Sequence, residues 1–151
     1  MEGDARDIVK EGIVSEIFPE RHTARVAFED KDNMVSAELP IITLWAMENK
    51  SYALPDVGEE VLCLFATNAD TTGEGWIIGS RFHDKSTPNA NSQDVTRIDF
   101  KDGTSIEYNR KDHALKVECK GTLEIKCDKD ITITSEKNMI LKGENIFINE
   151  G

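Results

Sequence analysis

The side chains best able to do chemistry are scattered along this sequence rather than grouped. Its three cysteines are odd in number and widely spaced, so they do not form a disulfide framework and instead fit assembly in a reducing compartment. Carboxylates are abundant, but two acids make a glycosidase only at a fixed separation in a cleft. The sequence contains no nucleophile elbow and no phosphate-binding loop. We therefore expect neither an enzymatic activity nor a cofactor.

The net charge and the hydropathy of the chain bear on whether it binds nucleic acid or a membrane. The chain carries 29 Asp and Glu against 18 Lys and Arg, which gives a formal charge of −11. Such a surface repels phosphate backbones, so we expect no nucleic-acid recognition. No apolar run reaches the length of a membrane span, and the start does not resemble a signal peptide. Any membrane contact is therefore expected to be mechanical or transient.

Residues 113–151 repeat with a period of eight. Within each octad the large apolar residues are two apart, which is the strand period, and polar residues gather at the octad boundaries, where a chain must turn. The period is too short for a helical array and right for a strand plus a corner. The third places are Leu115, Leu123, Ile131, Met139 and Phe147; the fifth are Val117, Ile125, Ile133, Leu141 and Asn149; the seventh are Cys119, Cys127, Ser135, Gly143 and Gly151.

One chain has too few of these strands to close a core of its own. About five strands, each with a single apolar edge, are fewer than a free-standing solenoid usually needs. Three chains that wind together would point the third- and fifth-place residues at a common axis and would pair every strand edge except those at the two ends. The simpler alternative is an antiparallel meander in a monomer, since alternation alone is common. The phased return every eight residues favours the intertwined trimeric β-helix.

Cys119 and Cys127 share the seventh place of neighbouring octads. In a trimer each would meet its own copies near the axis, and a ring of thiolates around a metal ion is one interpretation. The more ordinary interpretation is a buried cysteine that acts as a small apolar residue. We adopt the ordinary interpretation and expect no metal site.

Upstream of the repeat, the sequence predicts a small barrel. After a polar segment over residues 1–11, alternation and turn residues predict a five-stranded domain over 12–83. Five short strands with long third-to-fourth and fourth-to-fifth connections suit the oligonucleotide/oligosaccharide-binding (OB) barrel. Acidic residues crowd the strands that a nucleic-acid-binding barrel would use, so Trp45 and Trp76 are expected in the core or in subunit contacts. The strands are expected over 12–18, 24–28, 34–42, 61–66 and 76–80.

Two further segments connect the barrel to the octads. Residues 84–96 are nearly devoid of large apolar side chains, which predicts a linker. The stretch 97–108 alternates on both sides of Asp102 and Gly103, a strong hairpin signal. Its apolar spacing is not in phase with the octads, so we interpret it as a collar. The collar hairpin and the β-helix together span 97–151, and the fold class is all-β.

Several short motifs accompany this order of domains. They are Gly12-Ile13-Val14, Arg25-Val26, Val35-Ser36, Leu39-Pro40, Tyr52, Leu54-Pro55-Asp56-Val57-Gly58-Glu59-Glu60-Val61, Gly75-Trp76-Ile77-Ile78-Gly79-Ser80 and Asp99-Phe100-Lys101-Asp102-Gly103, followed by the octads. In this order they resemble the baseplate assembly protein V family, the central spikes of contractile phage tails, and the related spikes of tailocins and type VI secretion. The resemblance covers nearly the whole chain, and the order of the motifs is more specific than any one of them.

The resemblance implies a homotrimer on the axis of a contractile injection machine, in a virion or tailocin baseplate that is assembled in the host cytoplasm. Such a spike contacts the tail-tube and baseplate hub proteins, caps the tube at its barrel end and pierces the target envelope. Some family members bind iron through a His-x-His motif near the tip, which His22, His83 and His113 do not match. Others carry a lysozyme domain, for which the linker is too short. The alternatives are a hydrolase and a carbohydrate-binding OB module on a trimeric stalk.

The octad pattern decays at its C-terminal end, where Phe147, Asn149 and Gly151 form the expected tip. About five octads that each advance one strand spacing of about 4.8 Å make a shaft of only about 24 Å. Such a shaft is short for a piercing needle, so we expect a separate small protein to cap it. The alternative is that three Phe147 rings plug the axis while three Asn149 side chains close the hole or hold a water or an ion.

Overall fold

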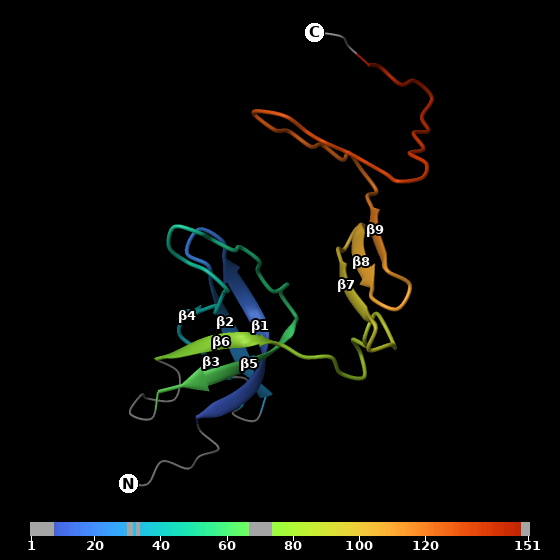
Figure 1. Cartoon of the computed structure of the whole chain (residues 1–151). Helices are drawn as coiled ribbons and strands as arrows, with labels where there is room; N and C mark the ends of the chain where they lie inside the picture. The colour runs from blue at the N-terminus through green and yellow to red at the C-terminus, as the bar shows by residue number, and fades with distance from the viewer. Residues whose placement is uncertain (1–7, 30–31, 33, 67–73, 149–151) are drawn as a thin grey trace. The chain divides into compact units, whose positions relative to one another are not determined.

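The computed structural model of the chain describes residues 8–29, 32, 34–66 and 74–148. It contains nine strands and, within those ranges, no α-helix, so the fold class is all-β as the sequence predicts. The chain divides into two compact units, residues 1–88 and 89–151 (Figure 1). Of the expected tip residues, Asn149 and Gly151 lie outside the described part.

The strands of the first unit agree closely with those expected from the sequence. They are β1 (Val9–Phe18), β2 (Thr23–Phe28), β3 (Met34–Val35), β4 (Leu39–Pro40), β5 (Glu60–Phe65) and β6 (Gly75–Ser80). β1 begins inside the segment that was expected to precede the barrel, and the expected third strand is divided into β3 and β4. Ser36 accounts for the division, because its hydroxyl, rather than a backbone carbonyl, accepts the Val26 N–H at 3.0 Å.

The first unit is one antiparallel sheet in the order β3-β2-β1-β5-β6, with β4 paired to β2. β1 is long enough to pair with β2 through one half and with β5 through the other. The sheet is open in its strand order. An isolated parallel bridge joins Ile41, just after β4, to Ile77 in β6, and the Ile42 N–H donates to the Ile77 carbonyl at 2.9 Å.

The buried core of the described residues lies in the first unit. The rings of Phe28 and Phe65 meet edge to face with their centroids 5.8 Å apart. The nine buried apolar residues are Val14, Ala24, Val26, Phe28, Leu39, Val61, Cys63, Phe65 and Ile77. Trp45 and Trp76 are 59% and 41% exposed, so the expectation that they belong to the core is wrong. Their role as subunit contacts stays a prediction.

Gly12→Ala is expected to destabilise the first unit. A Cβ at Gly12 would lie 2.5 Å from Val26 Cγ1 and 2.7 Å from the Ala27 carbonyl oxygen. Forcing a methyl group into a packed site typically costs about 1–3 kcal/mol. Thermal unfolding should therefore occur at a lower temperature than in Glu16→Ala, a control on the same strand whose exposed side chain lies 3.6 Å from Arg25. Equal melting temperatures would contradict the close approach of β1 and β2.

The second unit is a three-stranded antiparallel sheet in the order β7-β8-β9. β7 (Val95–Asp99) and β8 (Ser105–Asn109) form the expected hairpin, with Gly103 at φ 89° in the turn, a left-handed conformation that favours glycine. β9 (Ala114–Glu118) is the first octad, and it pairs with β8 of the same chain. The sequence did not predict this pairing. The described residues beyond β9 contain no strand.

Candidate functional site

The sheet of the second unit has one charged face and one apolar face. Directly opposed residues of an antiparallel pair point to the same side, so the register assigns each side chain to a face. Arg97 opposes Glu107, which opposes Lys116, and these form the charged face. The other face carries two cross-strand rows, Ile98–Ile106–Val117 and Thr96–Tyr108–Leu115. We call this side the collar face.

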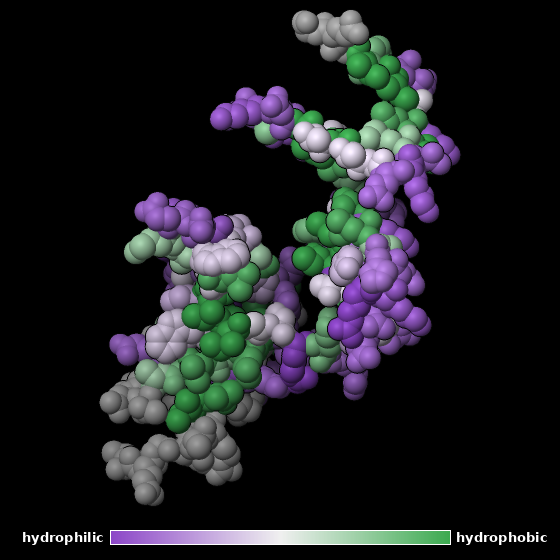
Figure 2. Space-filling model, viewed as in Figure 1, coloured by the Kyte–Doolittle hydropathy of each residue, from purple (hydrophilic) through white to green (hydrophobic). Residues whose placement is uncertain are grey.

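The collar face is exposed although it is apolar. Ile98, Ile106, Tyr108, Leu115 and Val117 are all exposed, with Leu115 at 69%, whereas Arg97 and Glu107 on the charged side are only partly exposed. This pattern is the inverse of the usual one, in which a sheet buries its apolar side and solvates its polar side. Figure 2 shows apolar surface gathered on this unit apart from its charged surface. A face of this kind indicates a contact that the second unit does not supply by itself.

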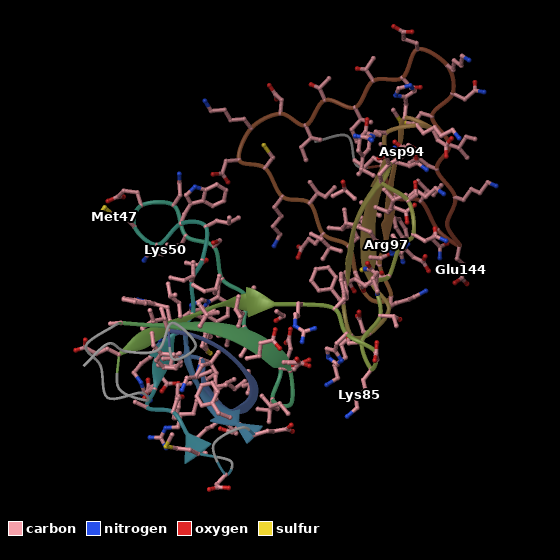
Figure 3. The ribbon with its side chains drawn as sticks, turned by 90° about the horizontal axis from the view of Figure 1, so that it is seen from below. Met47, Lys50, Lys85, Asp94, Arg97 and Glu144 are labelled. Carbon is pink, nitrogen blue, oxygen red and sulfur yellow. The ribbon has the colours of Figure 1, made fainter. Side chains whose placement is uncertain are left out.

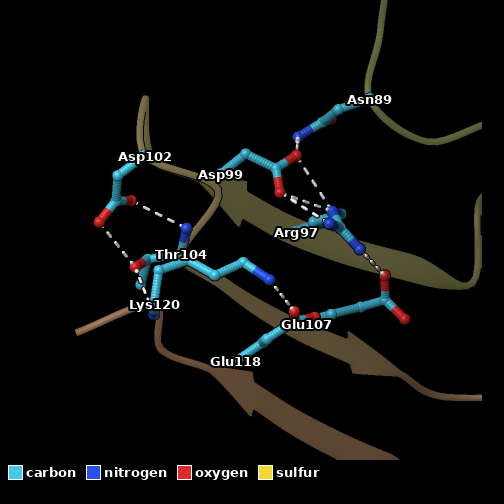
Figure 4. Close-up of polar contacts among 8 residues, drawn as sticks. All are labelled: Asn89, Arg97, Asp99, Asp102, Thr104, Glu107, Glu118 and Lys120. Atoms are coloured by element: carbon cyan, nitrogen blue, oxygen red, sulfur yellow. Dashed lines mark hydrogen bonds and ion pairs between the residues drawn. The ribbon is translucent and has the colours of Figure 1, made fainter. Parts of the chain in front are cut away.

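A network of hydrogen bonds and ion pairs fixes the charged face (Figure 4). Arg97 Nη1 lies 2.6 Å from Glu107 Oε2, while Arg97 Nε lies 2.9 Å from Asp99 Oδ1. Asn89 Nδ2 donates to Asp99 Oδ2 at 2.5 Å. Lys120 pairs with Glu118 at the end of β9. These bonds hold β7 and β8 together from the polar side and leave the collar face free for another contact.

The network also shifts the ionisation of its members. Hydrogen bonds from Arg97, and then from Asn89, hold the pKa of the Asp99 carboxyl below its ordinary value. The hydrogen bond with Lys120 does the same to the pKa of Glu118. The bonds to Asp99 and Glu107 raise the pKa of Arg97. All these groups are therefore charged near neutral pH, and the network is a structural one.

Arg97→Gln is expected to raise the pKa of Asp99 toward its ordinary value. Because the folded pKa of Asp99 is lowered, its stabilising effect is present above the carboxyl's unfolded pKa and is lost as the pH falls through the folded pKa. Carboxyl NMR titration of the full chain measures this shift directly. Arg110→Gln is the matched control, since Arg110 pairs with Asp94 at 2.6 Å instead. A pKa for Asp99 that is unchanged in Arg97→Gln would contradict the network.

Beyond the sheet, the chain bends once in every octad. Bends occur at residues 120–121, 128–129, 136–137 and 144, which are eight residues apart, and the segments between them are extended (Figure 1). These are the corners that the octads predict. The described residues 119–148 pair with no strand of their own chain. Their backbone groups therefore lack the ladder partners that an extended segment normally finds.

Every predicted axis residue in this segment is exposed in the single chain. Ile133 is 70% exposed and Phe147 is 85% exposed. The other axis residues of the segment are Leu123, Ile125, Ile131, Met139 and Leu141, and each is at least half exposed. The structure therefore does not bring the predicted axis residues together within one chain, and their place on a trimer axis stays a prediction.

Two of the seventh-place residues, Cys127 and Ser135, lie next to corners and contact the backbone there. The Cys127 sulfur lies 3.6 Å from the Asp130 carbonyl oxygen, and the Ser135 hydroxyl donates to the Asn138 carbonyl at 3.3 Å. The two contacts are equivalent by the repeat, since each joins the seventh place to the residue three positions later. Small polarisable or hydroxyl side chains at this place therefore shape the corner.

Three apolar residues near the C-terminal end were not among the predicted sites. Ile140, Ile146 and Ile148 occupy even places of their octads and are exposed. Their period of two puts them on the side opposite Met139 and Phe147. The apolar surface thus extends to both sides of the chain at this end. The sequence carried a signal for this surface, because the octads 137–144 and 145–151 are the only ones with isoleucine at even places.

The first unit also carries exposed apolar side chains. The loop between β4 and β5 projects away from the strands, with Met47 and Lys50 at its outer end (Figure 3). Leu44, Trp45 and Met47 in this loop are exposed. On the sheet itself, the register aligns Val9, Leu64 and Trp76 in a partly exposed row. Both features are candidate contact surfaces.

Two carboxylates and a histidine lie near one another in the described part of the first unit. A shallow hollow is lined in part by Glu11, Glu60 and His83. Arg81 bridges the two carboxylates, at 2.7 Å from Glu11 and 2.8 Å from Glu60, and lowers the pKa of Glu11. His22 contacts the Ala53 carbonyl at 2.9 Å, in a different part of the unit. The acids are thus held as partners of an arginine.

Compared with protein-family models and with curated proteins, the chain has no match. No helix in the described ranges is both long and apolar enough to cross a bilayer. Nor do those residues include a group of three or more His, Cys, Asp or Glu side chains placed to hold a metal ion. The collar face and the octads are the features from which a function can be inferred.

Proposed function

We propose that this chain is the structural central spike of a contractile injection machine, such as the baseplate of a phage tail or a tailocin. Three copies intertwine through their octads, cap the tail tube at the barrel end and transmit the force of sheath contraction to the target envelope. The spike does no bond chemistry of its own. It is assembled in the host cytoplasm and becomes part of the particle.

The observation that carries this proposal is the extended segment 119–148. It bends every eight residues, and the described part of the chain offers no partner strand to its backbone or to the apolar columns formed by its third- and fifth-place residues. Regular corners without internal pairing favour strands supplied by other copies, because a buried backbone group must be hydrogen-bonded. Burying each large apolar side chain fully on a common axis contributes about 1.5–3 kcal/mol. The collar face continues these columns through Leu115 and Val117 of β9.

The arrangement of the first unit supports the barrel part of the proposal. β1 is shared between two strand pairs, and the parallel bridge of Ile41 to Ile77 brings the end of β4 to β6. These are the contacts by which a five-stranded sheet would curl into a small OB barrel. The row of Val9, Leu64 and Trp76 and the loop with Trp45 offer surfaces for the tail-tube and hub proteins.

The end of the repeat supports a separate tip protein. Phe147 is exposed, and Ile146 and Ile148 flank it on the opposite side of the strand. Three copies would gather these apolar side chains into one exposed patch on the shaft, which favours a docked cap. The capped spike contacts the target membrane only transiently.

Light scattering of the purified full chain tests the proposal. We expect a single species with the mass of three 16.9 kDa chains, and a monodisperse monomer would overturn it. Release of fragments from peptidoglycan that is lost on substitution of a carboxylate would instead favour a hydrolase. Glycan binding by the first unit would favour a carbohydrate-binding module on a trimeric stalk.

A further inference from the structure

We propose that Cys119 of one chain and Cys127 of a neighbouring chain form disulfides that link the three chains covalently. This inference rests on the trimer of the proposed function. It concerns a modification that the spike acquires when it meets an oxidising, disulfide-containing environment outside the reducing cytoplasm. The two cysteines occupy the same place in consecutive octads, and both are exposed free thiols in the single chain.

The winding of three chains decides which thiols meet. When each octad occupies one face of a three-sided shaft and the next octad turns to the following face, a face stacks octad n of one chain on octad n+1 of another. The copies of Cys119 then lie at three different corners. In this arrangement the closest thiol to each is Cys127 of a neighbouring chain, rather than another copy of Cys119.

Between the first two octads, the charges on the outward places support this register. A residue and the one eight positions later become neighbours on adjacent strands. Lys116 then lies beside Glu124, and Glu118 lies beside Lys126, each in a different chain. Opposite charges at adjacent cross-strand positions stabilise a sheet, and like charges destabilise it. In the single chain, Glu124 and Lys126 lie 2.9 Å from each other and are exposed. Because exposed side chains can change partners, both can pair across chains.

The spacing of strands is compatible with a disulfide. Adjacent strands lie about 4.8 Å apart, which places the two Cα atoms within the usual range of about 4.4–6.8 Å for a disulfide. The Cβ atoms must approach about 0.3 Å closer than that spacing to reach the upper end of their usual range. The corner allows this adjustment, because β9 ends at Glu118 and the chain bends at residues 128–129, directly after Cys127. Among the described residues, no strand pairs with the edge of β9 away from β8.

The oxidation proceeds by thiol–disulfide exchange with a small-molecule disulfide such as oxidised glutathione. One cysteine thiolate attacks the small disulfide, which forms a mixed disulfide and releases one glutathione thiolate. The second cysteine thiolate displaces the other glutathione and closes the Cys119–Cys127 bond. Two protein thiols are oxidised, one glutathione disulfide is reduced to two thiols, and the protons of the cysteines pass to the released thiolates.

Cys63 provides an internal control. It is buried in the core of the first unit, and burial raises the pKa of its thiol to about 12. A thiol that is neither accessible nor ionised does not enter exchange at neutral pH. Cys63 should therefore be recovered as a free thiol from the oxidised protein, alkylated only after denaturation.

The test uses the full chain, purified under reducing conditions. Light scattering first establishes that the reduced protein has the mass of three chains. The protein is then incubated with oxidised glutathione, quenched by alkylation and run on a denaturing gel without reductant. We expect the single-chain band to be converted to a three-chain band, and reductant to reverse the change. Cys119→Ser and Cys127→Ser should each abolish the three-chain band while the reduced variants stay trimeric in solution.

Trypsin identifies the partners. Cleavage after the lysines places Cys119 in peptide 117–120 and Cys127 in peptide 127–129. We expect the three-chain band to contain these two peptides linked to each other. Three results would overturn the pairing. The first is a link between two copies of the same peptide, and the second is a link between the two different peptides that is found only in the single-chain band. The third is a trimer whose chains stay unlinked. A reduced protein with the mass of one chain would overturn the trimer itself, and the pairing with it.

Discussion

Ile133→Asp is expected to abolish trimer formation, whereas Thr132→Asp is expected to leave it intact. This difference is the most direct test of which octad places face the axis. Ile133 holds a fifth place and points at the axis of the proposed shaft, while Thr132 holds the neighbouring outward place. Three copies of an axis aspartate would gather three charges without partners in one layer, at a cost of several kcal/mol each. An aspartate at residue 132 would remain in water.

The structure makes this pair of variants a matched one. Both residues are exposed in the single chain, so a monomer has no reason to distinguish the two substitutions. Light scattering and thermal melts of the two variants, compared with the unmodified protein, measure the difference. Equal masses and equal melting temperatures would show that the register is wrong, since a slip of one residue exchanges the two faces of a strand.

Removal of residues 119–151 is expected to leave a monomer with an intact first unit. The truncation deletes the columns from Leu123 to Phe147, which are the main apolar surface that the trimer is proposed to bury. The buried core of the first unit ends at Ile77 and is untouched. Light scattering should give the mass of one chain, and thermal unfolding should retain the transition of the first unit.

Removal of residues 145–151 alone is the control for this truncation. It deletes only the last octad, so the remaining layers should still hold three chains together. A long truncation that stays trimeric would place the main contact in the collar face or in the first unit. That result would falsify the octads as the principal interface while leaving the trimer itself standing.

The strands of the first unit were predictable because period-two alternation and turn residues mark them directly. The break of the third strand was not, since it depends on a specific hydrogen bond from Val26 to the Ser36 hydroxyl. The exposure of Trp45 was also missed. A tryptophan favours burial on average, but its position in a projecting loop is set by the tertiary structure, as the hydrogen bond from the Ser51 N–H to its carbonyl at 3.0 Å illustrates.

The sequence predicted the eight-residue repeat of the candidate site but not the pairing of β9 with β8 in one sheet. The octads predicted the corners, which recur every eight residues. They did not predict that the first octad joins the collar, because the collar has no eight-residue phase. Antiparallel pairing requires only the strand period of two, and this suffices to align Ile106 with Val117 and Tyr108 with Leu115. The four residues between β8 and β9 turn the chain, with His113 at φ 52°.

The inverted burial of the second unit has a consequence for the life of an unassembled copy. Lys120, Lys126, Lys129 and Lys137 lie in the extended and exposed segment after β9, where a protease can bind the backbone in the strand conformation it requires. Cellular proteases degrade such accessible segments selectively, while assembly withdraws them into a paired ladder. If three copies assemble as proposed, an unassembled copy would therefore be open to degradation until it pairs with two others. On the proposed function, surplus chains would be degraded while assembled trimers would resist proteolysis.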